Sequence, residues 1–228
     1  ADVVGDAFWN SASLAITALI SVTIIAIPLG VVAALKRGTT ADLVIGFFSY
    51  IGASMPEFVT ATLLLVFVAG PALGLLPAGG FVALGESVGG FAAHVVLPAT
   101  TLGLILTAHI SRQVRSEMSE VLASDYIRAA RLKGLPERRV IRHHALPNSL
   151  APAVAVISLD IGYLLGGIIV VEEIFAWPGL GRLLIYALEN RDLPVIQAIT
   201  LLLATVYALT NLLSDIIIAF LDPRVHYA

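Results

Sequence analysis

The sequence predicts an all-α membrane protein, a polytopic bundle of helices that crosses the bilayer several times. Hydrophobic residues make up 58% of its 228 residues and charged residues only 13%, which is about half the charged fraction of an average soluble domain. The mean hydropathy is +0.95. Three long stretches, 7–35, 87–111 and 194–214, contain no Asp, Glu, Lys or Arg. This composition excludes an ordinary cytosolic enzyme.

Five stretches are long and apolar enough to be transmembrane helices. A helix needs about 20 mostly apolar residues to cross the hydrocarbon core. The predicted spans are residues 11–35, 43–69, 95–113, 150–175 and 195–221.

The basic residues are sorted by membrane side. Alternating spans place eleven of the 13 Lys and Arg residues on one side, which the positive-inside rule makes the cytoplasm. Lys36 and Arg37 follow the first span, Arg224 follows the fifth, and eight lie between the third and fourth. The sequence therefore predicts that its N-terminal end lies outside and its C-terminal end inside. Because it begins with Ala1 and lacks a basic signal-peptide region, we expect it to be a piece of a longer protein.

Glycines and carboxylates in the fourth span are candidates for a translocation pathway. Gly166 and Gly167 lie in the middle of this span, and Asp160 and Glu172 lie on either side of them. Irregular backbone and ionisable side chains at membrane depth are typical of transport pathways. The alternative is that the glycines allow close helix packing and that Glu172 is a packing or interfacial carboxylate. We take these four residues as candidate pathway residues.

The loop 114–148 is the one long polar segment. Ser124 and Asp125 favour a helix start, and Gly134 favours its left-handed end, so we expect a short helix over 125–133. Pro136 suits the first turn of a second helix that ends near Pro147. Asn148 or Ser149 is then expected to cap the fourth span.

The first loop helix has the composition of a docking helix. Ile127, Ala130 and the ring of Tyr126 are predicted to form an apolar surface, and Arg128 and Arg131 a basic rim. Such a helix suits a groove on another protein. The alternative is a basic inner loop that only obeys the positive-inside rule.

Three motifs resemble those of the permease subunits of ABC importers. The loop has the spacing of the family pattern E-A-A, three residues, G, nine residues, I, one residue, L-P, with Arg128 in place of Glu and His144 in place of Ile. Asp125 to Leu135 is similar to the D-Y-I-R-x-A-R-x-K-G-L of the dipeptide, oligopeptide and nickel branch. Residues 172–181 and 211–225 are similar to that branch's V-E-x-I-F-x-W-P-G-L-G and C-terminal L-D-P-R segments.

The resemblance implies a type I ABC importer permease, a single transmembrane domain over 1–228 in a bacterial or archaeal cytoplasmic membrane. It implies import of short peptides, or of a related small solute such as a nickel complex. The implied partners are a second, related permease subunit, two cytoplasmic ATPase subunits that bind ATP and Mg, an extracytoplasmic substrate-binding protein and membrane lipid. The implied ATPase-coupling residues are Asp125, Arg128, Ala129, Ala130, Arg131, Gly134, Leu146 and Pro147.

Other functional classes find less support in the sequence. There is no G-x-x-x-x-G-K-[ST] phosphate loop, no H-E-x-x-H or G-x-S-x-G motif and no cysteine. We therefore expect no enzymatic activity in this chain, no metal site, no cofactor and no nucleic-acid partner. The alternative function is an ion-coupled secondary transporter with Asp160 and Asp215 as a proton relay, but the expected inverted repeat is not evident. A membrane scaffold is a weaker alternative, since it has no need of broken helices.

Overall fold

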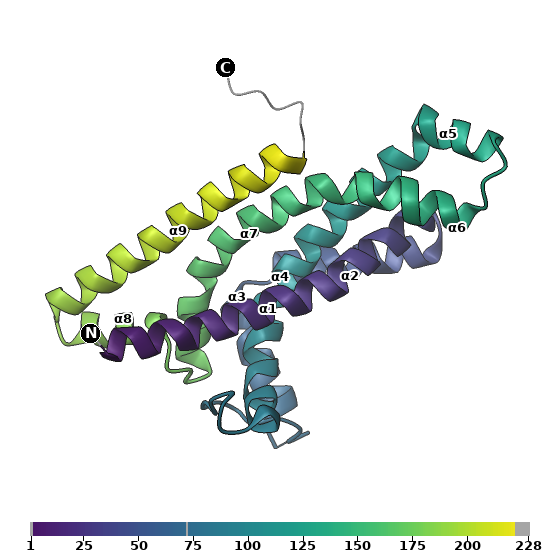
Figure 1. The fold of residues 1–228 in the computed structure, drawn as a ribbon. Helices are drawn as coiled ribbons and strands as arrows, with labels where there is room; N and C mark the ends of the chain where they lie inside the picture. The colour runs from purple at the N-terminus through teal and green to yellow at the C-terminus, as the bar shows by residue number, and fades with distance from the viewer. Residues whose placement is uncertain (1, 72, 222–228) are drawn as a thin grey trace.

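The computed structural model describes residues 2–71 and 73–221, and its regular elements are all helices (Figure 1). The elements in chain order are α1 (Asp2–Leu35), α2 (Thr40–Ser54), α3 (Glu57–Leu64), the π-helical η1 (Leu65–Ala69), α4 (Val88–Ala123), α5 (Asp125–Leu132), α6 (Glu137–Arg139), the π-helical η2 (Val140–Ala145), α7 (Leu146–Ile174), α8 (Leu180–Glu189) and α9 (Leu193–Leu221). The predicted all-α class is confirmed.

The long helices correspond to the predicted spans. Among the described residues, α1, α4 and Leu193–Ile217 of α9 are long and apolar enough to cross a membrane. The α2–α3 pair makes a fourth candidate span, but it bends by 105°. The remaining predicted span coincides with α7, which at 29 residues is about 43 Å long.

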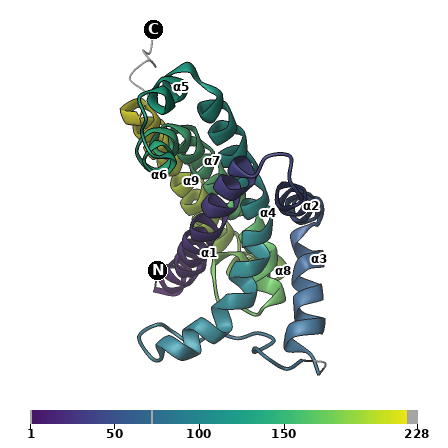
Figure 2. The same cartoon turned by 90° about the vertical axis from the view of Figure 1, so that its right-hand side faces the viewer.

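The bundle is centred on α4, which packs against α1, α2 and α7, and α9 packs on the far side of α7. Figures 1 and 2 show α5 and α6 together at one end of the bundle, and Figure 1 shows α8 near the N-terminus at the other. Alternating spans place the segments that contain α5 and α8 on opposite sides of the membrane, and these two segments lie at opposite ends of the bundle.

Small residues bring α1 close to α4. The buried side of α1 repeats at helical spacing through Leu14, Ala18, Val22 and Ala26. At Gly30 the approach is so close that a Cβ would lie 2.6 Å from the Ser111 carbonyl oxygen. Membrane helices have little hydrophobic driving force for association, so close backbone packing of this kind stabilises the pair.

We expect Gly30→Val to lower the free energy of unfolding by about 1 to 3 kcal/mol, because the new side chain overpacks this contact. Gly5→Val is the matched control, since a Cβ at Gly5 meets no atom within 4 Å. Thermal unfolding of both variants in detergent measures the difference. Equal melting temperatures for the two variants would contradict the close α1–α4 packing.

The structure decides between the alternatives for Gly166 and Gly167 and corrects one expected boundary. α7 is a continuous helix from Leu146 to Ile174, so the backbone is not irregular at these glycines. The chain also does not end a helix at Pro147, since η2 leads directly into α7. A proline inside a continuous helical stretch frees one backbone carbonyl, and the π-helical bonding of η2 immediately before Pro147 is the kind of local adjustment that accommodates it. Asn148 and Ser149 therefore cap nothing, and their side chains bond to the His144 and Leu146 carbonyls.

The break in the spanning helices lies in the second span instead. α2 ends at Ser54, Pro56 has the extended backbone that its ring allows, and α3 begins at Glu57. Irregular backbone at membrane depth occurs where protein or a cavity lies beside it.

Candidate functional site

The loop helix α5 is fixed to the rest of the chain by its apolar side. Ile127 is fully buried and Ala130 nearly so. They belong to a cluster at the base of the bundle whose other buried members are Ala34, Met118, Val140 and Ala145. The prediction that Ile127 and Ala130 form the docking surface for another protein is therefore wrong, because they face their own chain.

The turn after α5 has the geometry that Gly134 predicts. Gly134 has φ +77°, its N–H donates to the Arg131 carbonyl at 2.9 Å, and the Leu135 N–H donates to the Ala130 carbonyl at 3.4 Å. This pair of bonds is a Schellman motif, which needs a residue with positive φ. Leu135 packs against the same cluster as Ala130. The turn thus holds α5 at a fixed angle to α6.

Polar contacts connect α5 to the segment that follows it. Arg131 donates from both Nε and a terminal nitrogen to the Glu137 carboxylate, at 3.1 and 2.7 Å. These hydrogen bonds lower the pKa of Glu137 from its ordinary value. The Tyr126 hydroxyl donates to the His144 carbonyl at 3.1 Å and accepts from the Asn148 amide at 3.1 Å. Arg131 and Tyr126 therefore have structural contacts within the loop.

The outward side of α5 consists of Asp125, Arg128, Ala129 and Leu132, which share one helix face by their three- and four-residue spacing. Leu132 is 83% exposed, an unusually high value for a large apolar side chain. The sequence interpretation missed Leu132, although its spacing from Asp125, Arg128 and Ala129 identifies this second face.

Of the other predicted coupling residues, Leu146 and Pro147 lie in the first turn of α7 and not on α5.

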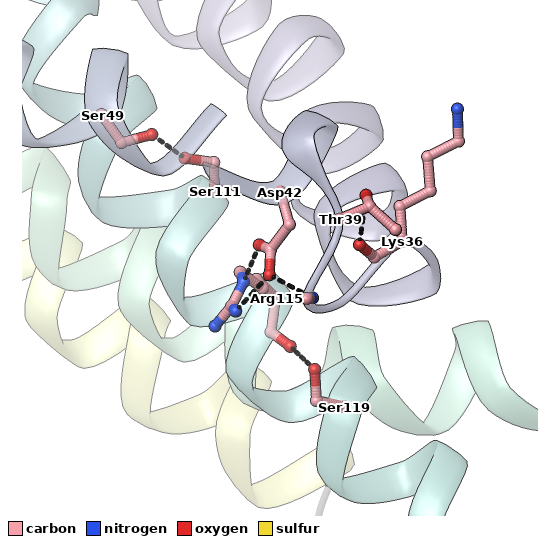
Figure 3. Close-up of polar contacts among 8 residues, drawn as sticks. Lys36, Thr39, Asp42, Ser49, Ser111, Arg115 and Ser119 are labelled. Carbon is pink, nitrogen blue, oxygen red and sulfur yellow. Dashed lines mark hydrogen bonds and ion pairs between the residues drawn. The ribbon is translucent and has the colours of Figure 1, made fainter. Parts of the chain in front are cut away.

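A salt bridge connects α2 to α4 (Figure 3). Arg115 of α4 donates from Nε and a terminal nitrogen to the Asp42 carboxylate, at 2.6 and 2.8 Å. The Gly38 N–H donates to the same carboxylate at 3.0 Å. One turn before Arg115 on α4, the Ser111 hydroxyl forms a 3.2 Å hydrogen bond with the Ser49 hydroxyl of α2. Asp42 is 7% exposed, and the paired groups hold α2 against α4, which continues to α5.

The break between α2 and α3 lies beside a polar cluster at membrane depth. Glu57, the first residue of α3, accepts a 2.6 Å hydrogen bond from the Tyr163 hydroxyl of α7. A Cβ at Gly167 would lie 3.2 Å from the same Glu57 oxygen. Gly167 is therefore a close-packing position, whereas Gly166 is exposed and its Cβ direction meets no atom within 4 Å.

Asp160 belongs to the same cluster. It is 7% exposed, and its Oδ1 lies 3.6 Å from Nδ1 of His109 on α4. Among the described residues, its Oδ2 is a buried atom that has no hydrogen-bond partner. Glu57, His109 and Tyr163 were not among the predicted pathway residues. Their common signal is that each is a polar side chain in or at the end of an apolar stretch.

Glu172 has a different role from the one expected. Its side chain is fully buried and accepts bonds from the Ser11 hydroxyl of α1 and from the N–H groups of Gly181 and Arg182 at the start of α8. A carboxylate at a helix N-terminus is stabilised by the unpaired N–H groups there. Glu172 thus joins three helices, and a place in an open pathway is not supported.

The proton relay of the alternative function also lacks support. Asp160 is buried beside α4, whereas Asp215 is an exposed residue of α9.

Residues 26–227 match the family described as "Binding-protein-dependent transport system inner membrane component". The chain is 41% identical to the dipeptide transport system permease protein DppB of Escherichia coli (strain K12), over 96% of this chain and 71% of that protein. It is 40% identical to the oligopeptide transport system permease protein AppB of Bacillus subtilis (strain 168), over 96% of this chain and 69% of that protein. The fold is similar to a chain in the inward-facing structure of the MetNI methionine ABC transporter, with a TM-score of 0.77, 18% identity and 96% of both chains covered.

Proposed function

This chain belongs to the family of binding-protein-dependent transport system inner membrane components and is a multi-pass permease subunit of an ABC importer, and we propose that it moves short peptides across the cytoplasmic membrane. The observation that carries the proposal is the 41% identity to a dipeptide permease over 96% of the chain. The similarity to an oligopeptide permease supports the same substrate class.

ATP hydrolysis in this proposal takes place in partner subunits. The sequence has no phosphate loop, and the outward face of α5 is suited to dock on a soluble ATPase. Leu132 offers an apolar anchor that is 83% exposed, and Arg128 and Asp125 offer charges at its rim. When two such ATPase subunits bind ATP and close together, they move α5 and the corresponding helix of a second permease subunit.

Motion of α5 has a direct route into the membrane. α5 follows α4 after the single residue Ser124, and the Asp42–Arg115 pair joins α4 to α2. α2 in turn ends at the break beside Glu57, Tyr163 and Asp160. The proposed pathway therefore lies along this polar cluster and is completed by the second permease subunit. An extracytoplasmic binding protein delivers the peptide at the end of the bundle where α8 lies.

Uptake by the assembled transporter in proteoliposomes tests the proposed substrate class. We expect ATP-dependent uptake of radiolabelled trialanine in the presence of the binding protein, and no uptake of free methionine under the same conditions. A proton ionophore should leave trialanine uptake unchanged, because ATP and not an ion gradient drives the permease. Uptake of methionine alone would contradict the peptide assignment, and uptake that needs no ATP but is abolished by the ionophore would contradict ABC transport.

A further inference from the structure

The free oxygen of Asp160 marks a site that needs a hydrogen-bond donor. A carboxylate inside a membrane protein is costly unless a partner compensates its charge. His109 faces Oδ1 at 3.6 Å, beyond hydrogen-bond distance. Oδ2 is buried and has no partner in the part of the chain that the structure describes. Asp160 is thus more than nine-tenths buried and incompletely satisfied.

The groups around Asp160 form a cluster rich in acceptors. Tyr163, three residues further on the same helix, donates its proton to Glu57 at 2.6 Å, so its lone pairs remain available. The ring of Tyr163 meets the His109 ring edge to face, with centroids 6.2 Å apart. The cluster thus contains two carboxylates, a phenol and an imidazole from three helices. Arg112, one turn after His109 on α4, lies over the Tyr50 ring and donates to the Ala108 carbonyl.

The cluster is open on one side. Tyr163 is 44% exposed and Leu159 is 65% exposed, and nothing lies within 4 Å of the Cβ direction of Gly166. These residues share one face of α7 by their three- and four-residue spacing. A solute that moves along this face therefore passes the Tyr163 phenol and the Glu57 carboxylate bonded to it, one turn of α7 from Asp160.

The chemistry of the cluster selects a compact organic cation. Two carboxylates repel an anionic group, and among the described residues no three His, Asp or Glu side chains are placed to hold a metal ion. An ammonium group offers three donors, which suits the free Asp160 oxygen, the Glu57 carboxylate and the lone pair of Tyr163. A cation is also attracted to the face of an aromatic ring.

We infer that Asp160, with Glu57 and Tyr163, forms a subsite in the translocation pathway for the positively charged N-terminal amino group of a peptide. This inference rests on the proposed peptide transport. Oδ2 of Asp160 is buried in this conformation, so it accepts a hydrogen bond from the ammonium group when the packing around the cluster opens during transport. Asp160 is therefore a specificity-determining residue of the pathway.

The test compares two peptides in the reconstituted transporter with its binding protein: trialanine, and propionyl-dialanine, which has the same shape without the amino group. We expect Asp160→Asn to lower trialanine uptake by about ten-fold or more, because a charge-assisted hydrogen bond is lost. Uptake of propionyl-dialanine should change by less than about two-fold. The binding protein is the same in every sample, so its own preference cancels in the comparison of variant with wild type.

Three further samples separate binding from folding and from the substrate class. Asp160→Glu keeps the charge and should retain most trialanine uptake, and Asp215→Asn is the matched carboxylate control on α9, with no expected effect. Equilibrium dialysis of radiolabelled trialanine against the detergent-solubilised complex without binding protein should show binding to wild type and not to Asp160→Asn.

The possible outcomes are distinguishable. Unchanged trialanine uptake and binding in Asp160→Asn would overturn the inference. Equal loss of both peptides, or failure of Asp160→Asn to assemble with the second permease, would also overturn it, because Asp160 would then have a structural partner. If wild type itself transports no trialanine, the proposed substrate class is wrong, and the subsite is rejected with it.

Discussion

Leu132→Glu is expected to release the ATPase subunits from the transporter, with a loss of affinity of about ten-fold or more. Leu132 is the exposed apolar side chain on the proposed docking face of α5, and burial of a Leu side chain contributes about 1.5 to 3 kcal/mol. A carboxylate at position 132 also adds the cost of burying a charge in the interface with the ATPase. Retention of the ATPase on the immobilised permease, measured in a pull-down, gives the effect.

Two control variants are compared with Leu132→Glu: one removes a charge from the same face of α5, and the other makes the same substitution in α8. Arg128→Ala should weaken association by only about 0.2 to 1 kcal/mol, because a solvated ion pair at a rim contributes little. Leu188→Glu places the same change at a 54% exposed Leu of α8, at the other end of the bundle, and should leave the ATPase bound. If Arg128→Ala alone removes the ATPase while Leu132→Glu keeps it, the docking face of α5 is assigned incorrectly.

The second large effect is expected at the salt bridge between α2 and α4. Arg115→Ala leaves the Asp42 carboxylate, which is 7% exposed, without its cation. Breaking a buried pair costs about 3 to 5 kcal/mol. Since the Arg115 side chain is 37% exposed, partial hydration reduces the expected loss to about 2 kcal/mol. Thermal unfolding in detergent measures the stability.

The same variant should also reduce coupling, because α2 is no longer held to the helix that leads to α5. We expect fewer peptides imported per ATP hydrolysed in proteoliposomes. The double variant Asp42→Ala/Arg115→Ala should recover part of the stability, since it leaves no unpaired carboxylate, but not the coupling. Arg112→Ala, one turn away on α4, is the control, because Arg112 has no carboxylate partner in the described residues. A full recovery of coupling in the double variant would contradict a role of the pair in transmission.

Ala130 illustrates how the three-dimensional structure changes the expected effect of a mutation. The sequence favours Ala130 as a docking residue, but its side chain is 8% exposed and packs on Met118 and its neighbours. A Glu at position 130 would therefore detach α5 from its own chain and would not report on the partner's groove.

The all-α membrane class, the positions of the spans and the short helix followed by a turn at Gly134 could all be predicted from the sequence. These features depend on local physics. A long apolar stretch without charges is stable in a bilayer as a helix, which satisfies its own backbone hydrogen bonds. A glycine that follows a helix with basic residues in its last turn predicts a positive φ. The structure gives α5 over Asp125–Leu132 and φ +77° at Gly134, in agreement.

Which side of each helix is buried could be learned only from the packing of the helices. The residues of α5 form two faces at helical spacing, and the sequence does not say that Met118 and Val140 cover the one with Ile127. Gly166 and Gly167 are adjacent and identical in chemistry, yet one is exposed and the other packs against Glu57. Glu172 has three donors from Ser11, Gly181 and Arg182, which no local pattern connects. Helical periodicity determines which side chains share a face of one helix, whereas the burial of that face depends on which other helix packs against it.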